Sequence, residues 1–135
     1  MGEPTIRRLH AGDEDVIRRL ADDEPRTALL ADPAMIFLVA FDGEEPVGFV
    51  FGYELDRRHG DARMLFVYEL EVHEAHRRRG IAARLLRDLL RRAQDDGIID
   101  AFVLTEPDND AANALYASLG GRRSTAHMYE WSPAS

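Results

Sequence analysis

Apolar runs, and the spacing of apolar positions within them, divide the chain into strand-like and helix-like segments. Short apolar runs between turn signals predict strands over residues 5–9, 35–41, 46–55, 63–72, 98–106 and 124–131. Apolar positions three or four residues apart predict helices over residues 12–23, 25–32, 78–96 and 108–120. The turn signal Asp42-Gly43 indicates that the second and third strands form a hairpin.

The order of these elements, β-α-α-β-β-β-α-β-α-β, predicts an α/β fold. Strand–helix–strand units favour parallel pairing and the hairpin is antiparallel, so we expect a mixed sheet with helices on both faces. A chain of 135 residues is large enough for one hydrophobic core but not for two. We therefore predict a single domain over residues 1–135.

Composition and charge exclude several classes of protein. All 17 basic residues are Arg, against 25 acidic residues, and the net charge is −8. An acidic chain with one basic cluster argues against a nucleic-acid partner, which needs a broad basic face. The absence of Cys excludes a disulfide framework and a thiolate nucleophile. No apolar run approaches the roughly 20 residues of a membrane span, and no signal-peptide pattern is present, so we expect no membrane partner and a cytoplasmic location.

The basic cluster lies where the strand 63–72 gives way to the helix 78–96. Unpaired N–H groups and the positive end of the helix dipole make such a helix start suitable for phosphate. Gly80 lets a phosphate approach the backbone, and arginines add charge and bidentate geometry. The predicted phosphate site comprises Arg77, Arg78, Arg79, Gly80, Ile81 and Ala82. The alternative is a solvated basic turn. We predict no metal site, because the strand-end pair His73 and His76 has no third ligand at useful spacing.

Two motifs then resemble a known family. RRRGIA (77–82) is similar to the Arg/Gln-x-x-Gly-x-Gly/Ala acetyl-CoA signature of the GNAT superfamily (Gcn5-related N-acetyltransferases). NDAANALYASLG (109–120) is similar to the Asn-x6-Tyr-x3-Gly helix of the same family. The resemblance implies that acetyl-CoA is the co-substrate, that the loop holds its pyrophosphate, and that Asn109 and Tyr116 contact CoA, with Tyr116 facing the sulfur.

The stretch YELEVHEAHRRRGIAARLL also resembles the type I aminoglycoside 3-N-acetyltransferase branch, and the closing HMYEW fits that branch. The resemblance implies an aminoglycoside acceptor and a catalytic acid on the strand before the loop. The sequence departs from the pattern at two positions. Glu69 stands where the branch more usually has Asp, and Gly121 stands where the wider family commonly has Phe after the Gly of the helix motif. No motif for the acceptor precedes residue 63.

Acetyl transfer to an amine needs a base for the ammonium and stabilisation of the leaving thiolate. We expect the even positions of the strand 64–72 to pack on the helix layer, and the odd positions to enter a cleft where they become acidic. Glu69 is the predicted base and Glu71 the rival. The alternative is that both are merely exposed strand carboxylates.

The resemblance also implies that the backbone of Leu70 to Val72 pairs with the pantetheine arm, near an oxyanion-stabilising N–H group. Tyr116 is the predicted acid or thiolate stabiliser, although a tyrosine on an apolar helix stripe is also typical of a core residue with a satisfied hydroxyl. Tyr129 and Trp131 are expected to close the core or to line the acceptor cleft. Glu54 and Asp56, with Tyr53, are expected beside that cleft.

These observations predict an N-acetyltransferase that moves an acetyl group from acetyl-CoA to a primary amine of a polycationic small molecule, with an aminoglycoside as the leading acceptor. Two alternatives stay open: a protein or peptide amine acetyltransferase, and a non-catalytic acyl-CoA-binding sensor. A homodimer is also left open.

Overall fold

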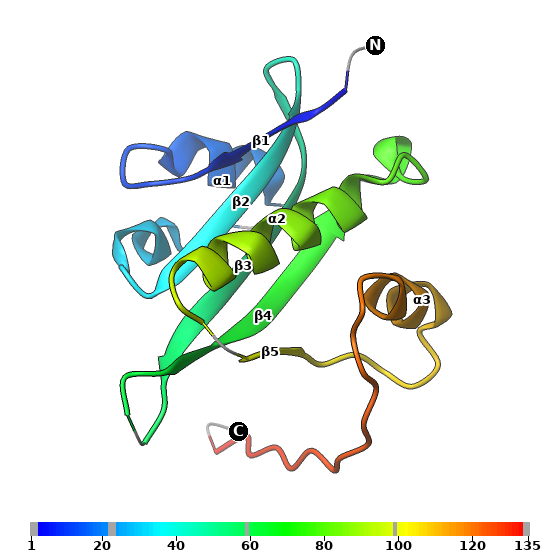
Figure 1. Cartoon of the computed structure of the whole chain (residues 1–135). Helices are drawn as coiled ribbons and strands as arrows, with labels where there is room; N and C mark the ends of the chain where they lie inside the picture. Colours follow the sequence, from blue (N-terminus) through cyan, green and yellow to red (C-terminus); the bar gives the residue numbers. More distant parts are fainter. Residues whose placement is uncertain (1–2, 22–23, 59, 99, 134–135) are drawn as a thin grey trace.

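The computed structural model describes residues 3–21, 24–58, 60–98 and 100–133, and its centre is one five-stranded sheet (Figure 1). The strands are β1 (Thr5–Arg8), β2 (Met35–Asp42), β3 (Glu45–Asp56), β4 (Arg63–Val72) and β5 (Asp100–Val103), in that spatial order. Neighbouring strands are antiparallel except β4 and β5, which are parallel. The predicted mixed α/β sheet is confirmed.

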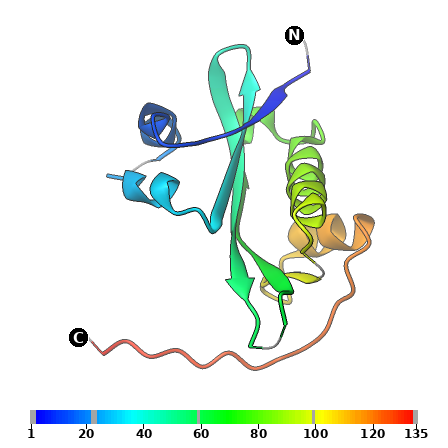
Figure 2. The ribbon, with the colours of Figure 1, turned by 60° about the vertical axis from the view of Figure 1, so that its left-hand side comes forward.

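The helices lie on both faces of this sheet, as predicted. They are α1 (Glu14–Leu20), α2 (Ile81–Asp95) and α3 (Asp110–Ser118), with short 3-10 helices η1 (Thr27–Ala31) and η2 (Glu74–His76). In Figure 2, α1 and η1 lie on one side of the sheet, whereas α2 and α3 lie on the other. All three α-helices are shorter than predicted, and the predicted helix over 25–32 is a 3-10 turn. Residues 22, 23 and 99 of the predicted elements lie outside the described residues.

Each face has its own hydrophobic cluster. The cluster on the α2 side is built around one stripe of that helix, formed by Ile81, Leu85, Leu86, Leu89 and Ala93. The cluster on the α1 side contains Phe37, Phe49 and Phe51, whose rings stack. Because β2 and β3 are covered on both faces, they carry nearly continuous apolar runs rather than an alternating pattern.

A β-bulge in β4 overturns the predicted division of that strand. Val67 pairs with Gly52 and Glu69 pairs with Phe51, so Tyr68 is an extra residue. Leu65 and Val67 therefore face α2, but beyond the bulge Leu70 and Val72 face it instead. The prediction that all the even positions pack on the helix layer is wrong, because one inserted residue reverses the alternation of the strand.

Gly52 makes this bulge possible. A Cβ atom built on Gly52 would lie 2.6 Å from the backbone oxygen of Phe66, closer than a backbone contact tolerates. Only glycine allows the two strands to approach so closely at this point.

The predicted closing strand over 124–131 is also wrong. The chain after α3 is extended but forms no strand, and it runs below the sheet, apart from β5, in both views (Figures 1 and 2). Tyr129 and Trp131 are 78% and 82% exposed, so within the described chain they neither close the core nor lie in a cleft. An apolar run alone does not make a strand, since a strand also needs a partner for its backbone groups.

Candidate active site

The basic loop before α2 has the geometry of an anion site. Gly80 immediately precedes the helix with φ +74°, and a Cβ atom there would meet nothing within 4 Å. No side chain caps this end of α2, so the N–H groups of its first turn have no side-chain acceptor. Arg78 also has a positive φ, +65°, which turns the chain sharply into the helix. This backbone fits a phosphate group.

The three arginines of the loop differ in what they contact. Arg77 Nε donates to the carbonyl of Val72 at 2.9 Å, which ties the loop to the end of β4. The Arg79 guanidinium lies 3.0 Å from His76 Nδ1 and 3.5 Å from Asp42 Oδ2 at the end of β2. Across the described ranges, the exposed guanidinium of Arg78 makes no hydrogen bond or ion pair. Arg77 and Arg79 therefore hold the loop in place, and Arg78 keeps all its donors for a ligand.

The end of β4 opens toward the space beside β5. The two strands pair only over Met64–Val67 and Asp100–Val103. The His73 N–H donates to the carbonyl of Val47 at 2.9 Å. In an antiparallel pair every second residue bonds to the neighbouring strand, so the backbone groups of residues 69 and 71 point toward β3. Those of Leu70 and Val72 therefore point away from β3. The predicted pairing of this backbone with the pantetheine arm stays a prediction, and the Val72 carbonyl already accepts a hydrogen bond from Arg77.

Glu69 and Glu71 lie on the α1 side of the sheet. They pair across the ladder with Phe51 and Phe49, which belong to the cluster on that side. Loss of hydration against the sheet raises the pKa of Glu69, and the like charge of Glu71 raises it further. Partial burial is the larger of these two causes of the raised pKa.

An aromatic surface surrounds Glu69, and of its residues only Tyr53 was expected beside the cleft. Tyr68 is 60% exposed, and its ring lies 5.3 Å from Phe51, 6.0 Å from Tyr53 and 5.7 Å from Phe66. The bulge places Tyr68 and Glu69, which are adjacent in sequence, on the same side of the sheet. An exposed aromatic beside a carboxylate is suited to a cationic ligand.

Tyr116 lies at the edge of the core. Its ring packs against the cluster on the α2 side, and burial raises the pKa of its hydroxyl. In the part of the chain that the structure describes, this hydroxyl forms no hydrogen bond. Tyr116 is therefore not a core tyrosine with a satisfied hydroxyl. Its protonated hydroxyl can donate a hydrogen bond to a ligand.

Asn109 has a clear structural role. Its side-chain oxygen accepts from the N–H of Ala112 at 3.1 Å, so it is the N-cap of α3. The Asn113 side chain donates to the carbonyls of Glu106 and Asn109, which secures the loop before the helix. The predicted CoA contact of Asn109 stays a prediction, and its oxygen is occupied as a cap.

Glu54 does not lie beside the cleft. It pairs with Leu65 across the ladder, which places it on the α2 side, and its carboxylate forms an ion pair with Arg63. Burial raises the pKa of Glu54, and Arg63 opposes this shift.

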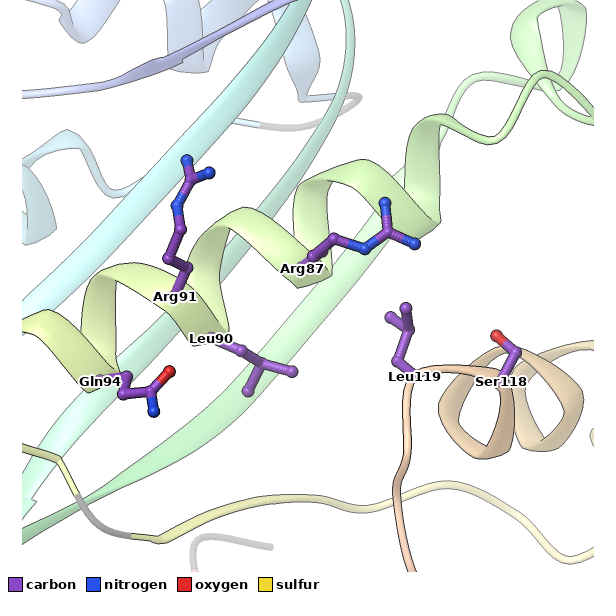
Figure 3. Close-up of a pocket in the computed structure, with 6 residues that line it drawn as sticks. All are labelled: Arg87, Leu90, Arg91, Gln94, Ser118 and Leu119. Carbon is purple, nitrogen blue, oxygen red and sulfur yellow. The ribbon is translucent and has the colours of Figure 1, made fainter.

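A groove of about 430 Å³ lies between α2 and α3 (Figure 3). Its lining residues are Arg87, Leu90, Arg91, Gln94, Ser118 and Leu119. In Figure 3 the guanidinium of Arg87 extends toward α3, whereas Arg91 points away and pairs with Asp88 at 2.8 Å. None of the predicted catalytic residues lines this groove.

Within the described residues, no group of three or more His, Asp or Glu side chains could hold a metal ion. No described helix is long and apolar enough to cross a membrane.

The sequence profile of the Acetyltransferase (GNAT) family matches residues 4–120. The chain belongs to the GNAT family. The resemblance of the loop 77–82 and of the helix 109–120 is thereby confirmed, and both motifs of this GNAT chain lie inside the matched region.

Known proteins resemble this GNAT chain over different lengths. An L-2,4-diaminobutyric acid acetyltransferase of Streptomyces anulatus is 36% identical over 83 residues, which cover 61% of this chain and 46% of that protein. The chain thus spans about half the length of the curated relatives it matches.

Two solved structures match nearly the whole chain. The aminoglycoside acetyltransferase HMB0005 from an uncultured soil metagenomic sample is 28% identical, with a TM-score of 0.82 and coverage of 99% of this chain and 100% of that one. The aminoglycoside acetyltransferase meta-AAC0020, also from an uncultured soil metagenomic sample, has a TM-score of 0.86 over 95% of each chain. At 21% identity, meta-AAC0020 shows the shared fold alone.

Proposed function

We propose that the protein transfers an acetyl group from acetyl-CoA to a primary amine of a small polycationic molecule. The observation that carries this proposal is the end of β4–β5 pairing at Val67, on the stretch of chain that leads from Tyr68 and Glu69 to the Gly80 loop. A donor that bound its phosphates at the loop would run along Leu70 and Val72 toward Glu69.

The residues suit direct transfer without a covalent enzyme intermediate. Glu69 would take a proton from the acceptor ammonium, directly or through one water, and the neutral amine would then attack the thioester carbonyl. A backbone N–H of the open strand would stabilise the negative charge on that oxygen. Collapse would release the CoA thiolate, and the Tyr116 hydroxyl would donate a hydrogen bond or a proton to it.

The acceptor is proposed to be polycationic because of the charges at the site. Glu69 and Glu71 lie on one face of β4, and Tyr68 beside them presents an exposed ring. Two carboxylates favour a ligand with more than one ammonium group, and the ring adds a cation–π contact. An aminoglycoside is the leading acceptor, supported by the likeness to HMB0005 over the whole chain.

Release of free thiol from acetyl-CoA tests the proposal. The chain has no Cys, so the protein contributes no thiol background. The amines compared should include aminoglycosides, 2,4-diaminobutyrate, a linear polyamine and a peptide with a free N-terminus. Thiol release with polycationic small amines is the expected result. Release with the peptide alone would favour the protein or peptide acetyltransferase, and acetyl-CoA binding without release would favour the sensor.

A further inference from the structure

Asp42 lies at the end of β2, far in sequence from the loop 77–82, yet its carboxylate contacts two basic side chains at that loop. Asp42 Oδ2 lies 3.5 Å from the Arg79 guanidinium and 3.8 Å from His76 Nδ1. The Arg79 guanidinium in turn donates to His76 Nδ1 at 3.0 Å, because a guanidinium can only donate. Asp42, His76 and Arg79, here called the hairpin cluster, therefore tie the β2–β3 hairpin to the loop before α2.

The hairpin cluster is partly buried. The side chains of Asp42, His76 and Arg79 are 19%, 15% and 26% exposed, whereas those of the ion pair between Asp15 and Arg18 on α1 are 90% and 51% exposed. Exposed ion pairs contribute little, because water and salt screen them, but partly buried pairs are screened less. The hairpin cluster is therefore suited to hold a segment of backbone in place.

The backbone of the loop needs such a contact. Arg79 lies between two residues with positive φ, Arg78 at +65° and Gly80 at +74°. A non-glycine residue rarely adopts this conformation, so local preference alone does not keep the loop in its shape. The side chain of Arg77 bonds to a residue only five positions away. Among the hydrogen bonds and ion pairs between described residues, only those of Asp42 join a side chain of the loop to a distant segment.

The charge of Asp42 argues against direct contact with an anionic ligand. A carboxylate beside a phosphate site repels the phosphate, so by charge alone the site would bind an anion better without Asp42. The contribution of Asp42 is instead made through Arg79, whose guanidinium it holds away from solvent, while Arg78 keeps its donors for a ligand.

We propose that Asp42 is a positioning residue for the acetyl donor. By holding Arg79, it keeps the backbone N–H groups of the loop 77–82 directed at the phosphates of acetyl-CoA. This inference rests on the proposed function, since it takes acetyl-CoA as the ligand of the loop. It adds to the donor site a residue of β2, which sequence spacing does not connect with the loop.

Isothermal titration with acetyl-CoA tests the sign of the effect. Asp42→Asn should bind acetyl-CoA about tenfold more weakly, the size expected when one coupling between neighbouring groups is lost, although this variant removes a repelling charge. Equal or tighter binding by Asp42→Asn would overturn the inference and leave the proposed function standing. No binding by the parent protein would overturn the proposed function, and this inference with it.

Glu45→Gln is the matched control. Glu45 is exposed and pairs with Asp42 across the hairpin, so this variant removes the same charge from the same turn. Between described residues, no ion pair joins Glu45 to the loop. Glu45→Gln should bind acetyl-CoA as the parent does, or slightly more tightly. A tenfold loss in the control as well would overturn the assignment to the contact between Asp42 and Arg79.

A double-mutant cycle shows whether Asp42 acts through Arg79. Arg79→Gln should weaken acetyl-CoA binding, and adding Asp42→Asn should cause no further loss, because the carboxylate then has no guanidinium to hold. Asp42→Glu keeps the carboxylate and should retain most of the affinity.

The same titrations at low and high salt separate positioning from long-range charge. The ratio of the parent affinity to the Asp42→Asn affinity should persist at high salt, since the hairpin cluster is partly buried. Additive losses in the double variant, or a ratio that falls to one at high salt, would overturn the inference.

Discussion

The N-terminal part of the chain (residues 3–98) and the C-terminal part (residues 100–133) contribute differently to the fold. The buried hydrophobic residues lie between Leu9 and Ile98, whereas no described residue from 100 to 133 is buried. The contrast is clear in two helices on the same side of the sheet: α2 buries five residues and α3 buries none. The loop before α2 and the strand carboxylates thus rest on a packed scaffold, whereas Tyr116 packs against that core from a helix that has no buried residue of its own.

The largest effect is expected at the loop 77–82 before α2, in the N-terminal part of the chain. Gly80→Val should abolish acetyl-CoA binding, because the new side chain would occupy the space that a phosphate needs and would strain a residue at φ +74°. Isothermal titration with acetyl-CoA checks this. Gly60→Val is the matched control: Gly60 has φ +68° and equally open surroundings, so it reproduces the strain away from the loop. Equal affinity in a folded Gly80→Val protein would exclude the phosphate site.

The next largest effect is expected at Glu69 and Glu71, on the α1 side of β4. Glu69→Gln removes both base and charge, so turnover should fall by about 10²–10⁴-fold and polycationic amines should bind more weakly, while acetyl-CoA binding is unchanged. The rate of the parent should rise with pH through the raised pKa of Glu69, and the variant should lack that step. Glu71→Gln, the control on the same face, should lose less of both. If Glu71→Gln lost turnover while Glu69→Gln kept it, Glu71 would be the base.

The ionised carboxylate of Glu69 should lower the stability of the folded protein, although it is expected to raise turnover. Because the folded state raises the pKa of Glu69, its contribution to stability is fully present below the ordinary carboxyl pKa and is lost as the pH rises through the raised value. Glu69→Gln should therefore melt at or slightly above the temperature of the parent near pH 7. The difference should shrink as the pH falls below about 4, where the carboxyl becomes protonated in both states. If the Glu69→Gln protein melted well below the parent at pH 7, the ionised carboxylate of Glu69 would not destabilise the folded state.

Tyr116 tests whether the C-terminal part contributes chemistry. Tyr116→Phe keeps the ring that packs against the core and removes a hydroxyl without a partner in the described chain, so the melting temperature should change little. Turnover should fall by on the order of 10²-fold, as for the loss of a proton-transfer group. Full activity with lowered stability would instead make Tyr116 a packing residue.

The smallest effect is expected at Asn109. As an N-cap it should be replaced well by Asp, whereas Asn109→Ala should cost about 1 kcal/mol of local helix stability. Hydrogen exchange of α3 amides measures this directly, and the core amides should be unaffected because α3 buries no residue. Equal loss of CoA affinity in the Asp and Ala variants would show a ligand contact beyond the cap.

The sequence predicted most of the elements and the position of the loop before α2, because their signals are local. The α2 stripe and the Gly80 junction are visible from neighbouring residues alone. The sequence did not reveal the bulge, because the extra residue Tyr68 is defined only by how β4 pairs with β3. It mispredicted the closing strand for the same reason, since an apolar run does not say whether a partner strand lies beside it.

The aromatic surface and the roles of the arginines were missed on similar grounds. Tyr68 followed an apparently regular alternation, so its exposure could not be inferred before the bulge was known. Arg77 and Arg79 reach Val72 and Asp42 through contacts that sequence spacing does not encode. The one available signal was the close-packing requirement at Gly52, a glycine in the middle of an apolar strand.

The bulge has a consequence for how this chain tolerates changes in length. In a regular strand consecutive side chains face opposite sides, so a one-residue deletion moves every later side chain to the wrong layer. Loss of the single codon for Tyr68 would act differently, because Val67 would still face α2 and Glu69 would still face α1. The layers would survive, while β4 would straighten beside β5 and the opening at Leu70 would narrow. At this one position a deletion should therefore preserve the core while it changes the backbone at the proposed acetyl-CoA site.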